Sequence, residues 1–283
     1  MYSVSFQKDN GETFLLGKDN NIVFDIDGLS GLPVDIGTSQ GAAQVGESVE
    51  TQSVNGKTLT VKGYIFNEIQ SGKRKLLKYF SAFQSGKLFF GNYYIYVYVQ
   101  ESPTVSPIKN NGTFTMLLFA PYPFFRKTLS TDGTIGAVTP QFSFPVTYSS
   151  TGTHSFGLRA SVKYANFVNS GDVEIPFSVT ISADSESTNP TLTNLITFEK
   201  LAINGTLNTG DILRIYRTEN GVLKANLTSG GIQSDAMSMI DEESDLWYLH
   251  VGDNLINISD DEGSANVLVT IEYNEAISGV YEE

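Results

Sequence analysis

Along most of the chain, hydrophobic and polar positions alternate or form short apolar blocks, which is the pattern of β-strands. The turn residues Asp9-Asn10-Gly11 and Gly91-Asn92 separate neighbouring blocks and have the composition of hairpin turns. The pattern predicts a mainly β first domain with at least two hairpins. Its expected strands are residues 2–6, 13–16, 22–26, 57–64, 88–90, 93–100 and 113–119.

A single segment has a convincing helical period. Lys73–Phe83 is predicted to be a helix, with Gly72 before it and Gly86 at its end. Three basic residues open this segment, and their sign is the opposite of the one that the dipole of a helix favours in its first turn. They serve either solubility or a partner. The predicted apolar stripe, which must lie on a sheet, consists of Leu76, Leu77, Phe80 and Phe83.

A glycine-rich segment between Gly28 and Gly46 is predicted to be a long loop around a short strand, Val34–Ile36. A long loop of this kind inside a compact domain more often has a function than none. The loop contains Gly-Thr-Ser-Gln-Gly around Ser39, which matches the nucleophile elbow of serine hydrolases in letters alone. Because the elbow needs a following helix and the glycines here oppose one, we do not predict catalysis at Ser39.

The segment Gly112–Arg126 ends the first domain. Its strand cannot continue through Pro121 and Pro123, because proline lacks the donor that a sheet requires. The Thr-, Ser- and Gly-rich residues that follow predict a linker. We therefore expect a first domain over residues 1–130, a linker over 131–140 and a second domain over 141–283.

Short strands at regular spacing, with turn residues between them, fill the second half. This arrangement predicts an antiparallel β-sandwich of jelly-roll type. The expected strands are residues 142–148, 155–160, 162–168, 173–183, 192–197, 200–203, 211–217, 222–227, 245–250, 255–259 and 265–273.

The formal net charge of −13 is carried by the second half. Residues 1–135 have a balance of +1, whereas residues 136–283 have a balance of −14. Binding of the second half to nucleic acid is disfavoured, because phosphate contacts need cations. The chain has no cysteine, which excludes disulfides and thiolate chemistry, and no apolar run long enough to cross a membrane.

No catalytic or metal-binding motif stands out. The two histidines, His154 and His250, lie far apart in the sequence. The acidic groups near Asp241 and Asp260 have the character of exposed loop charges, although they could hold a cation. Trp247 could stack on a sugar or belong to the core. We expect no cofactor, no metal site and no enzymatic activity.

Alternation in the strand 93–100 gives one side to Tyr94, Tyr96 and Tyr98. Two interpretations stay open: the tyrosines pack in the core, or they form a subunit interface, where tyrosine is common. Phe124 and Phe125, which leave the sheet after the prolines, carry a further apolar load that must be buried.

In order and spacing, several segments resemble the distal tail proteins of long-tailed phages of the siphophage type. In the first half these are GLSGLPVDIGTSQGAAQVGE, GKRKLLKYFSAFQSGKLFF, YIYVYVQESP and GTFTMLLFAPYPFFR. In the second half they are Asn189-Pro190, GTLNTGDILRI, SDLWYLHVGDNLINI and ANVLVTIEYNEAISGVY. The resemblance covers nearly the whole chain.

The resemblance implies a structural protein of the virion tail tip, assembled in the host cytoplasm. The first domain would close into a homo-hexameric ring with a channel for DNA, and the second would be a galectin-like sandwich. The ring would join the tail tube protein to the tail-tip protein and carry receptor-binding proteins. Its interface candidates are Tyr94, Tyr96, Tyr98, Phe124 and Phe125. The alternative is a carbohydrate-binding module that acts through the second domain, although the residue set by which galectins hold sugar is not evident here.

Overall fold

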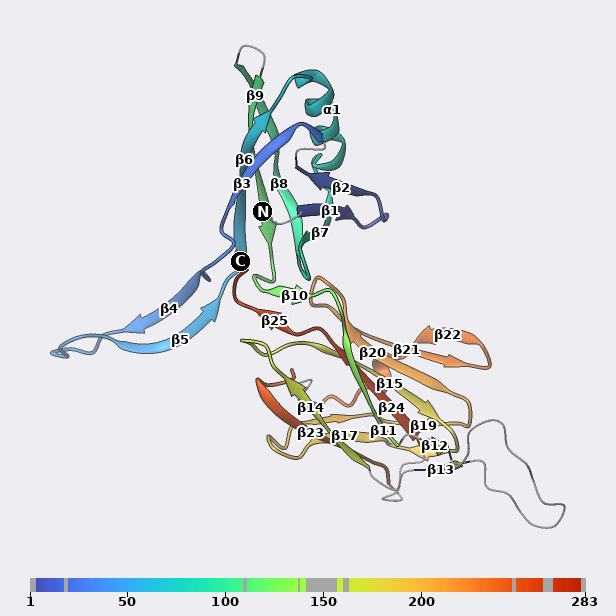
Figure 1. Cartoon of the computed structure of the whole chain (residues 1–283). Helices are drawn as coiled ribbons and strands as arrows, with labels where there is room; N and C mark the ends of the chain where they lie inside the picture. Colours follow the sequence, from blue (N-terminus) through green and yellow to red (C-terminus); the bar gives the residue numbers. More distant parts are fainter. Residues whose placement is uncertain are drawn as a thin grey trace. The chain divides into compact units, whose positions relative to one another are not determined.

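The chain consists of two compact units, shown in Figure 1. The computed structural model describes residues 4–17, 20–108, 111–136, 138–140, 157–159, 163–245, 248–261 and 267–280. The first unit comprises residues 1–129 and 276–283, and the second comprises residues 130–275. Within the described residues, no helix has both the length and the apolar character to span a bilayer.

The boundaries differ from the predicted ones at two places. Strand β11 (Thr131–Ile135), which was expected to be linker, pairs with β24 (Val267–Tyr273) inside the second unit. Strand β25 (Ala276–Ile277), which was expected in the second domain, pairs with β10 (Phe125–Lys127) of the first unit. Both segments are short, and each forms a strand by pairing with residues more than a hundred positions away in the sequence. Their local composition therefore did not predict these strands.

A long antiparallel sheet forms the first unit, in the order β2-β1-β7-β8-β9-β6-β3. One face of each strand points into a core that includes Phe6, Leu59, Leu88 and Phe114, none of which is more than 2% exposed. The strands are β1 (Val4–Lys8), β2 (Thr13–Leu16), β3 (Ile22–Asp27), β6 (Lys57–Ile65), β7 (Ser85–Phe90), β8 (Tyr93–Ile108) and β9 (Asn111–Ala120). Both predicted hairpins form, and β9 ends immediately before Pro121 as expected.

Helix α1 (Ile69–Tyr79) begins four residues before the predicted helix and ends four residues earlier. The shift places Gly72 inside the helix, where it is buried against Ile65. Leu76 and Phe80 are buried as predicted, but Leu77 is 38% exposed and Phe83 is fully exposed. The predicted apolar stripe was therefore half wrong, because the buried face follows Gly72 and Leu76 around the helix.

The predicted glycine-rich loop contains two paired strands, β4 (Val34–Ser39) and β5 (Ser48–Val54). They pair only with each other and join no other sheet of the described chain. We call residues 34–54 the arm. It is longer and more regular than the short strand expected from the sequence, and Figure 1 shows it as a two-stranded ribbon.

Two larger antiparallel sheets build most of the described second unit, beside the two-stranded pairs β12-β13 and β16-β19. One has the order β11-β24-β15-β20-β21-β22 and the other the order β14-β23-β17-β18. The predicted mainly β fold with a sandwich in its second part is confirmed. The remaining strands are β12 (Val138–Pro140), β13 (Gly157–Arg159), β14 (Tyr164–Asn169), β15 (Phe177–Ala183), β16 (Ser187–Thr188), β17 (Thr191–Asn194), β18 (Lys200–Ala202), β19 (Thr206–Leu207), β20 (Ile212–Arg217), β21 (Leu223–Ser229), β22 (Ile232–Asp235) and β23 (Gly252–Ser259).

Two predicted strands of this unit have a different outcome. The strand expected at residues 142–148 lies outside the described residues. The described part of residues 245–250 forms no strand, although Leu249 makes an isolated bridge with Ile175. A short 3₁₀ helix, Met237–Met239, follows β22.

Candidate interaction surfaces

The predicted tyrosine strip, Tyr94, Tyr96 and Tyr98, lies on the outer face of β8 and is unevenly covered. Tyr94 is only 6% exposed, and the ammonium of Lys87 lies 4.4 Å from the centre of its ring. Tyr96 and Tyr98 are half-buried, with their rings 5.5 Å apart. Tyr94 is therefore a packed residue of the first unit, whereas the other two keep an accessible edge.

The hydroxyl of Tyr96 donates to the carboxylate of Asp9 at 3.0 Å. Ser85 donates to the same carboxylate at 2.6 Å. Burial, above all, raises the pKa of Tyr96 to about 12, and the bond to Asp9 adds to this effect. The tyrosine thus anchors the turn between β1 and β2, which is a structural role that the sequence did not reveal.

The phenylalanines after the prolines also differ from each other. Phe125 is fully buried, and its ring lies edge-on to Phe90 at 5.5 Å. Phe124 is half-buried and lies 5.0 Å from the ring of Tyr122. Phe125 belongs to the core and cannot contact a neighbour, so Phe124 alone stays a candidate from this pair.

Large apolar side chains gather on one face of the arm. Val34 lies directly opposite Val54, and Ile36 lies on the same side two residues further along. The pairing shifts by one residue after Gly37, so that Val49 opposes Thr38 and comes to the same face. All four apolar residues are 45% to 56% exposed. The opposite face carries Asp35, Ser39, Ser48, Thr51 and Ser53.

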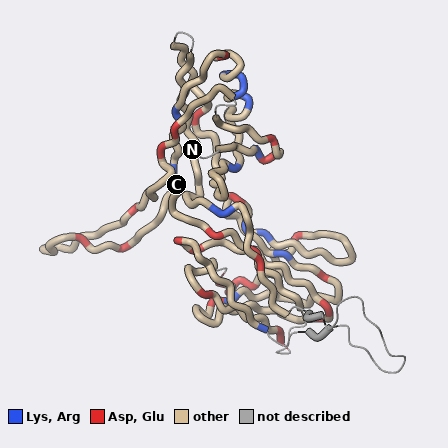
Figure 2. Tube along the Cα trace, in the orientation of Figure 1, with Lys and Arg blue, Asp and Glu red and all other residues tan. Residues whose placement is uncertain are grey.

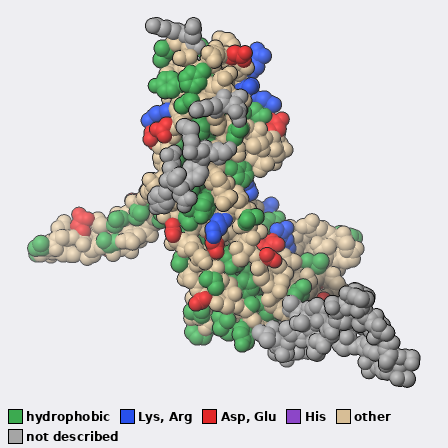
Figure 3. All heavy atoms as spheres, viewed as in Figure 1, with side chains coloured by type: hydrophobic (Ala, Val, Ile, Leu, Met, Phe, Trp, Pro, Cys, Tyr) green, Lys and Arg blue, Asp and Glu red, His purple; other side chains and the backbone are tan. Residues whose placement is uncertain are grey.

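The arm is therefore an amphipathic hairpin whose apolar face is uncovered, and Figure 3 shows hydrophobic side chains along it. Isolated two-stranded hairpins are only marginally stable in water. Acidic residues are its sole charges: Asp35, Glu47 and Glu50 lie between residues 28 and 56, which contain no lysine or arginine. The sequence hid this pattern because the shifted pairing interrupts the simple alternation of β5.

A second exposed surface lies on α1 and the turn that follows it. Lys73, Arg74 and Leu77 share one side of the helix, since they are three and four residues apart. Figure 2 shows the basic residues of this region and the acidic residues of the arm. The helix begins at Ile69, so Lys73 and Arg74 lie in its middle, where the helix dipole acts weakly. The prediction of a basic first turn was therefore wrong.

Phe83 has an unusual backbone as well as a fully exposed ring. Its φ angle is +65°, in the left-handed region that residues with a side chain rarely adopt. The predicted terminal glycine, Gly86, instead lies in β7, where a Cβ atom would come within 2.1 Å of the Gln7 carbonyl oxygen. We call Lys73, Arg74, Leu77 and Phe83 the helix surface.

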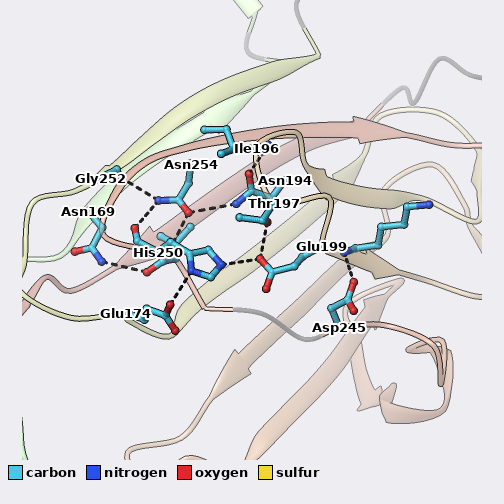
Figure 4. A network of polar contacts seen from close by, with 12 residues as sticks. Asn169, Glu174, Asn194, Ile196, Thr197, Glu199, Asp245, His250, Gly252 and Asn254 are labelled. Carbon is cyan, nitrogen blue, oxygen red and sulfur yellow. Dashed lines mark hydrogen bonds and ion pairs between the residues drawn. The ribbon is translucent and has the colours of Figure 1, made fainter.

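Three buried asparagines organise the loops at one end of the four-stranded sheet in the second unit (Figure 4). The side-chain amide of Asn254 donates to the carbonyl oxygens of Phe167, His250 and Gly252, and its oxygen accepts from Asn194. Asn169 donates to the carbonyl oxygens of Val173 and Leu249 in the same way. The asparagines thus bond backbone groups of the loops and of the strand ends next to them, so the network fixes the conformation of these loops.

At the edge of this network, His250 bridges two glutamates. Its Nδ1 lies 2.8 Å from Glu174 and its Nε2 lies 2.8 Å from Glu199. These hydrogen bonds, led by that of Glu199, raise the pKa of His250. The imidazolium joins the loop before Ile175 to the loop before Lys200, and the two carboxylates on opposite sides of the ring cannot share one metal ion with it.

The acidic residues proposed as cation ligands serve the fold instead. Asp241 accepts from the Asn204 side chain and the Glu243 backbone, and Asp245 accepts from the backbone of Lys200. Among the described residues, no group of three or more His, Asp or Glu side chains is placed to hold a metal ion. The oxygen Oγ of Ser39 donates to Glu50 within the arm. His154 and Trp247 lie outside the described residues.

A family model matches part of this chain, and nearly all of the matched residues lie in the second unit. Residues 170–276 match the family model of the siphovirus-type tail component, C-terminal domain. No curated protein sequence matches the chain.

Solved structures match over both units. The chain is similar to the Dit protein of phage SPP1, described as a paradigm of the hub adsorption apparatus in phages that infect Gram-positive bacteria. The TM-score is 0.67 at 12% identity, with 98% of this chain and 99% of the SPP1 chain covered. It is also similar to chains of the phage p2 baseplate in its activated conformation with strontium and with calcium. The TM-scores are 0.53 and 0.51, the identities 11% and 12%, and the coverage 99% of this chain and 100% of each p2 chain.

The structural likeness, at these identities, establishes a shared fold, and the family model identifies the second unit. Together they confirm the resemblance seen in the sequence: residues 170–276 belong to the siphovirus-type tail component, C-terminal domain, and the chain as a whole shares the fold of the SPP1 hub protein.

Proposed function

We propose that the chain forms a homo-hexameric ring at the distal end of the tail, where it joins the tail tube protein to the tail-tip protein. The likeness to the SPP1 hub protein over both units carries this proposal, because the match extends through the first unit as well as the matched family domain. The ring would leave a central channel for DNA and present the second units as sites for receptor-binding proteins.

The surfaces of the first unit support self-association. A cyclic ring uses a heterologous interface, in which one patch of a subunit meets a different patch of its neighbour. The first unit offers several patches for this purpose, since the apolar face of the arm, Phe83 and the edges of Tyr96 and Tyr98 are all uncovered. Exposed apolar groups gathered on one element mark interaction sites more often than scattered ones.

Native mass spectrometry tests the proposal directly. We expect a species of six chains of 30.9 kDa each, and negative-stain images with a central opening. A chain that stays single at every concentration, and also when mixed with the tube and tail-tip proteins of its own phage, would refute the ring. A ring with another number of chains would correct the proposed stoichiometry but would still support a ring-shaped hub.

The tyrosine strip has a separate test. Changing Tyr96 and Tyr98 together to serine removes their accessible edges, and light scattering then reports whether the ring persists. An intact ring would exclude the strip from the interface. Because Tyr96 also holds Asp9, the circular dichroism of the variant must match that of the wild type for the result to concern the interface.

A further inference from the structure

We infer that the apolar face of the arm of one copy binds the helix surface of the next copy. The arm as a whole is acidic and the helix surface is basic, and both expose apolar groups that their own chain leaves uncovered. The arm has three acidic residues and no basic residue, whereas α1 has four basic residues and no acidic one. This inference rests on the proposed ring and specifies which patches meet in it.

The first step of the argument is that the arm needs a cover. Val34, Ile36, Val49 and Val54 converge on one face only because the pairing shifts after Gly37. Without that shift, Val49 would point to the polar face with Ser39. Irregular pairing that re-aims a side chain is a feature commonly found where a strand serves a function. A face assembled in this way and left half-exposed fits a surface that another chain covers.

The second step is that the helix surface has charged and apolar groups without partners in its own described chain. Lys73 and Arg74 have no ion pair or hydrogen bond among the described residues, whereas Lys75 bonds Asn20 and Lys78 pairs with Glu12. On the same side of the helix as these two free cations, Leu77 is 38% exposed, and Phe83, in the turn after the helix, is fully exposed. An acidic hairpin with an apolar face would supply carboxylates for the two cations and an apolar cover for Leu77 and Phe83.

The third step concerns the source of the hairpin. Every residue of the two arm strands except Gly37 is exposed, so the arm does not lie on the helix of its own chain. A second copy supplies the same hairpin with the same charge. Since the arm and the helix surface are different patches of one chain, their contact is head-to-tail, which is the type that closes into a ring.

Cysteine cross-linking tests the contact, and the absence of cysteine from the chain removes any background. One chain carries Val49→Cys and a second, with a different affinity tag, carries Leu77→Cys. A short thiol-specific cross-linker is added to the mixed ring. We expect a covalent dimer that contains both tags. The matched control, Ser53→Cys with Leu77→Cys, places the thiol on the polar face of the arm and should link at least tenfold less.

Charge reversal gives an independent readout. Lys73→Glu with Arg74→Glu, or Glu47→Lys with Glu50→Lys, should each raise the concentration needed for assembly at least tenfold. All four changes in one chain should restore assembly at the concentration that the wild type needs. The control, Glu242→Lys with Glu243→Lys, makes the same charge change on exposed residues of the second unit and should leave assembly unchanged.

The outcomes separate the two proposals. A ring that assembles normally despite both reversals, or that gives no link between Val49→Cys and Leu77→Cys, overturns the arm contact and leaves the hub ring standing. If the reversals spare the ring but abolish binding of the tube or tail-tip protein, the helix surface and arm serve that partner instead, which also overturns the inference. A wild-type chain that never assembles refutes both proposals.

Discussion

The buried amine of Lys57 allows a sharp prediction about the stability of the first unit. Lys57 begins β6, is 5% exposed, and its Nζ has no hydrogen-bond partner among the described residues. The Nζ lies 4.5 Å from the centre of the Phe125 ring, which offers a cation–π contact. Burial lowers the pKa of Lys57 from 10.5 to about 8.

The sign of the effect follows from the two pKa values. Between pH 8 and pH 10.5 the unfolded chain binds more protons than the folded chain, so folding becomes more favourable as the pH rises. Below pH 8 both states carry the charge, and the burial cost is present in full. A shift of this size corresponds to a cost of about 3 kcal/mol, and the cation–π contact offsets about 1 kcal/mol of it.

Lys57→Met keeps the length of the side chain and removes its charge. At pH 7 we expect the variant to unfold with a free energy about 2 kcal/mol higher than that of the wild type, which corresponds to a rise in Tm of roughly 5 °C. The gain should shrink at pH 9.5, because the wild-type amine is then neutral. Thermal unfolding followed by circular dichroism at both pH values measures the difference.

Lys62→Met is the matched control, because Lys62 lies on the same strand but is exposed and paired with Asp27 at 2.8 Å. That pairing raises the pKa of Lys62, so its contribution stays constant from pH 7 to pH 9.5. A Lys57→Met variant that is less stable than the wild type at pH 7, with the same difference at pH 9.5, would refute the reasoning. It would mean that the amine has found water or an acceptor.

Three further predictions concern local structure. The raised pKa of His250 means that its stabilising contribution is complete below pH 6.5 and is lost as the pH rises through the higher folded value. His250→Gln should therefore flatten the fall in Tm of the second unit above neutral pH. Asn254→Ala removes the hydrogen bonds that its buried side-chain amide donates to three backbone carbonyl oxygens and should lower the free energy of unfolding in urea by about 2 to 4 kcal/mol. Gly72→Ala adds a Cβ atom 2.4 Å from Ile65 and should lower Tm, whereas Ser71→Ala, on the exposed side of α1, should leave it unchanged or raise it.

The fold class could be predicted from the sequence because it depends on local periodicity. Both predicted hairpins of the first unit and most strands of the second fall where alternation and turn residues place them. The strands that were missed, such as β11 and β25, are held by partners distant in the sequence. The helix boundaries failed for a related reason: Gly72 is unfavourable in a helix by itself, and only its close contact with Ile65 explains its presence.

The candidate surfaces were less predictable than the fold. Alternation correctly put three tyrosines on one side of β8, but it could not show that Tyr94 is covered or that Tyr96 holds Asp9. The arm was expected to be a loop because its glycines, which favour loops, were given more weight than its valines, which favour strands. Its single apolar face depends on a shift in strand pairing, which is a property of two strands together and cannot be read from the interrupted alternation of β5 alone.

The two units differ in how they accommodate residues in unfavourable surroundings, such as buried polar side chains or exposed apolar ones. In the second unit, buried polar groups such as Asn169 and Asn254 are fully engaged within the chain, so their cost is offset inside the fold. In the first unit, the strained and exposed Phe83 and the uncovered face of the arm have no such compensation among the described residues. Departures from local consistency that the fold does not offset are expected at functional sites. Because the helix that precedes Phe83 is basic and the arm is acidic, we expect each of these surfaces to cover the other, across the boundary between two copies.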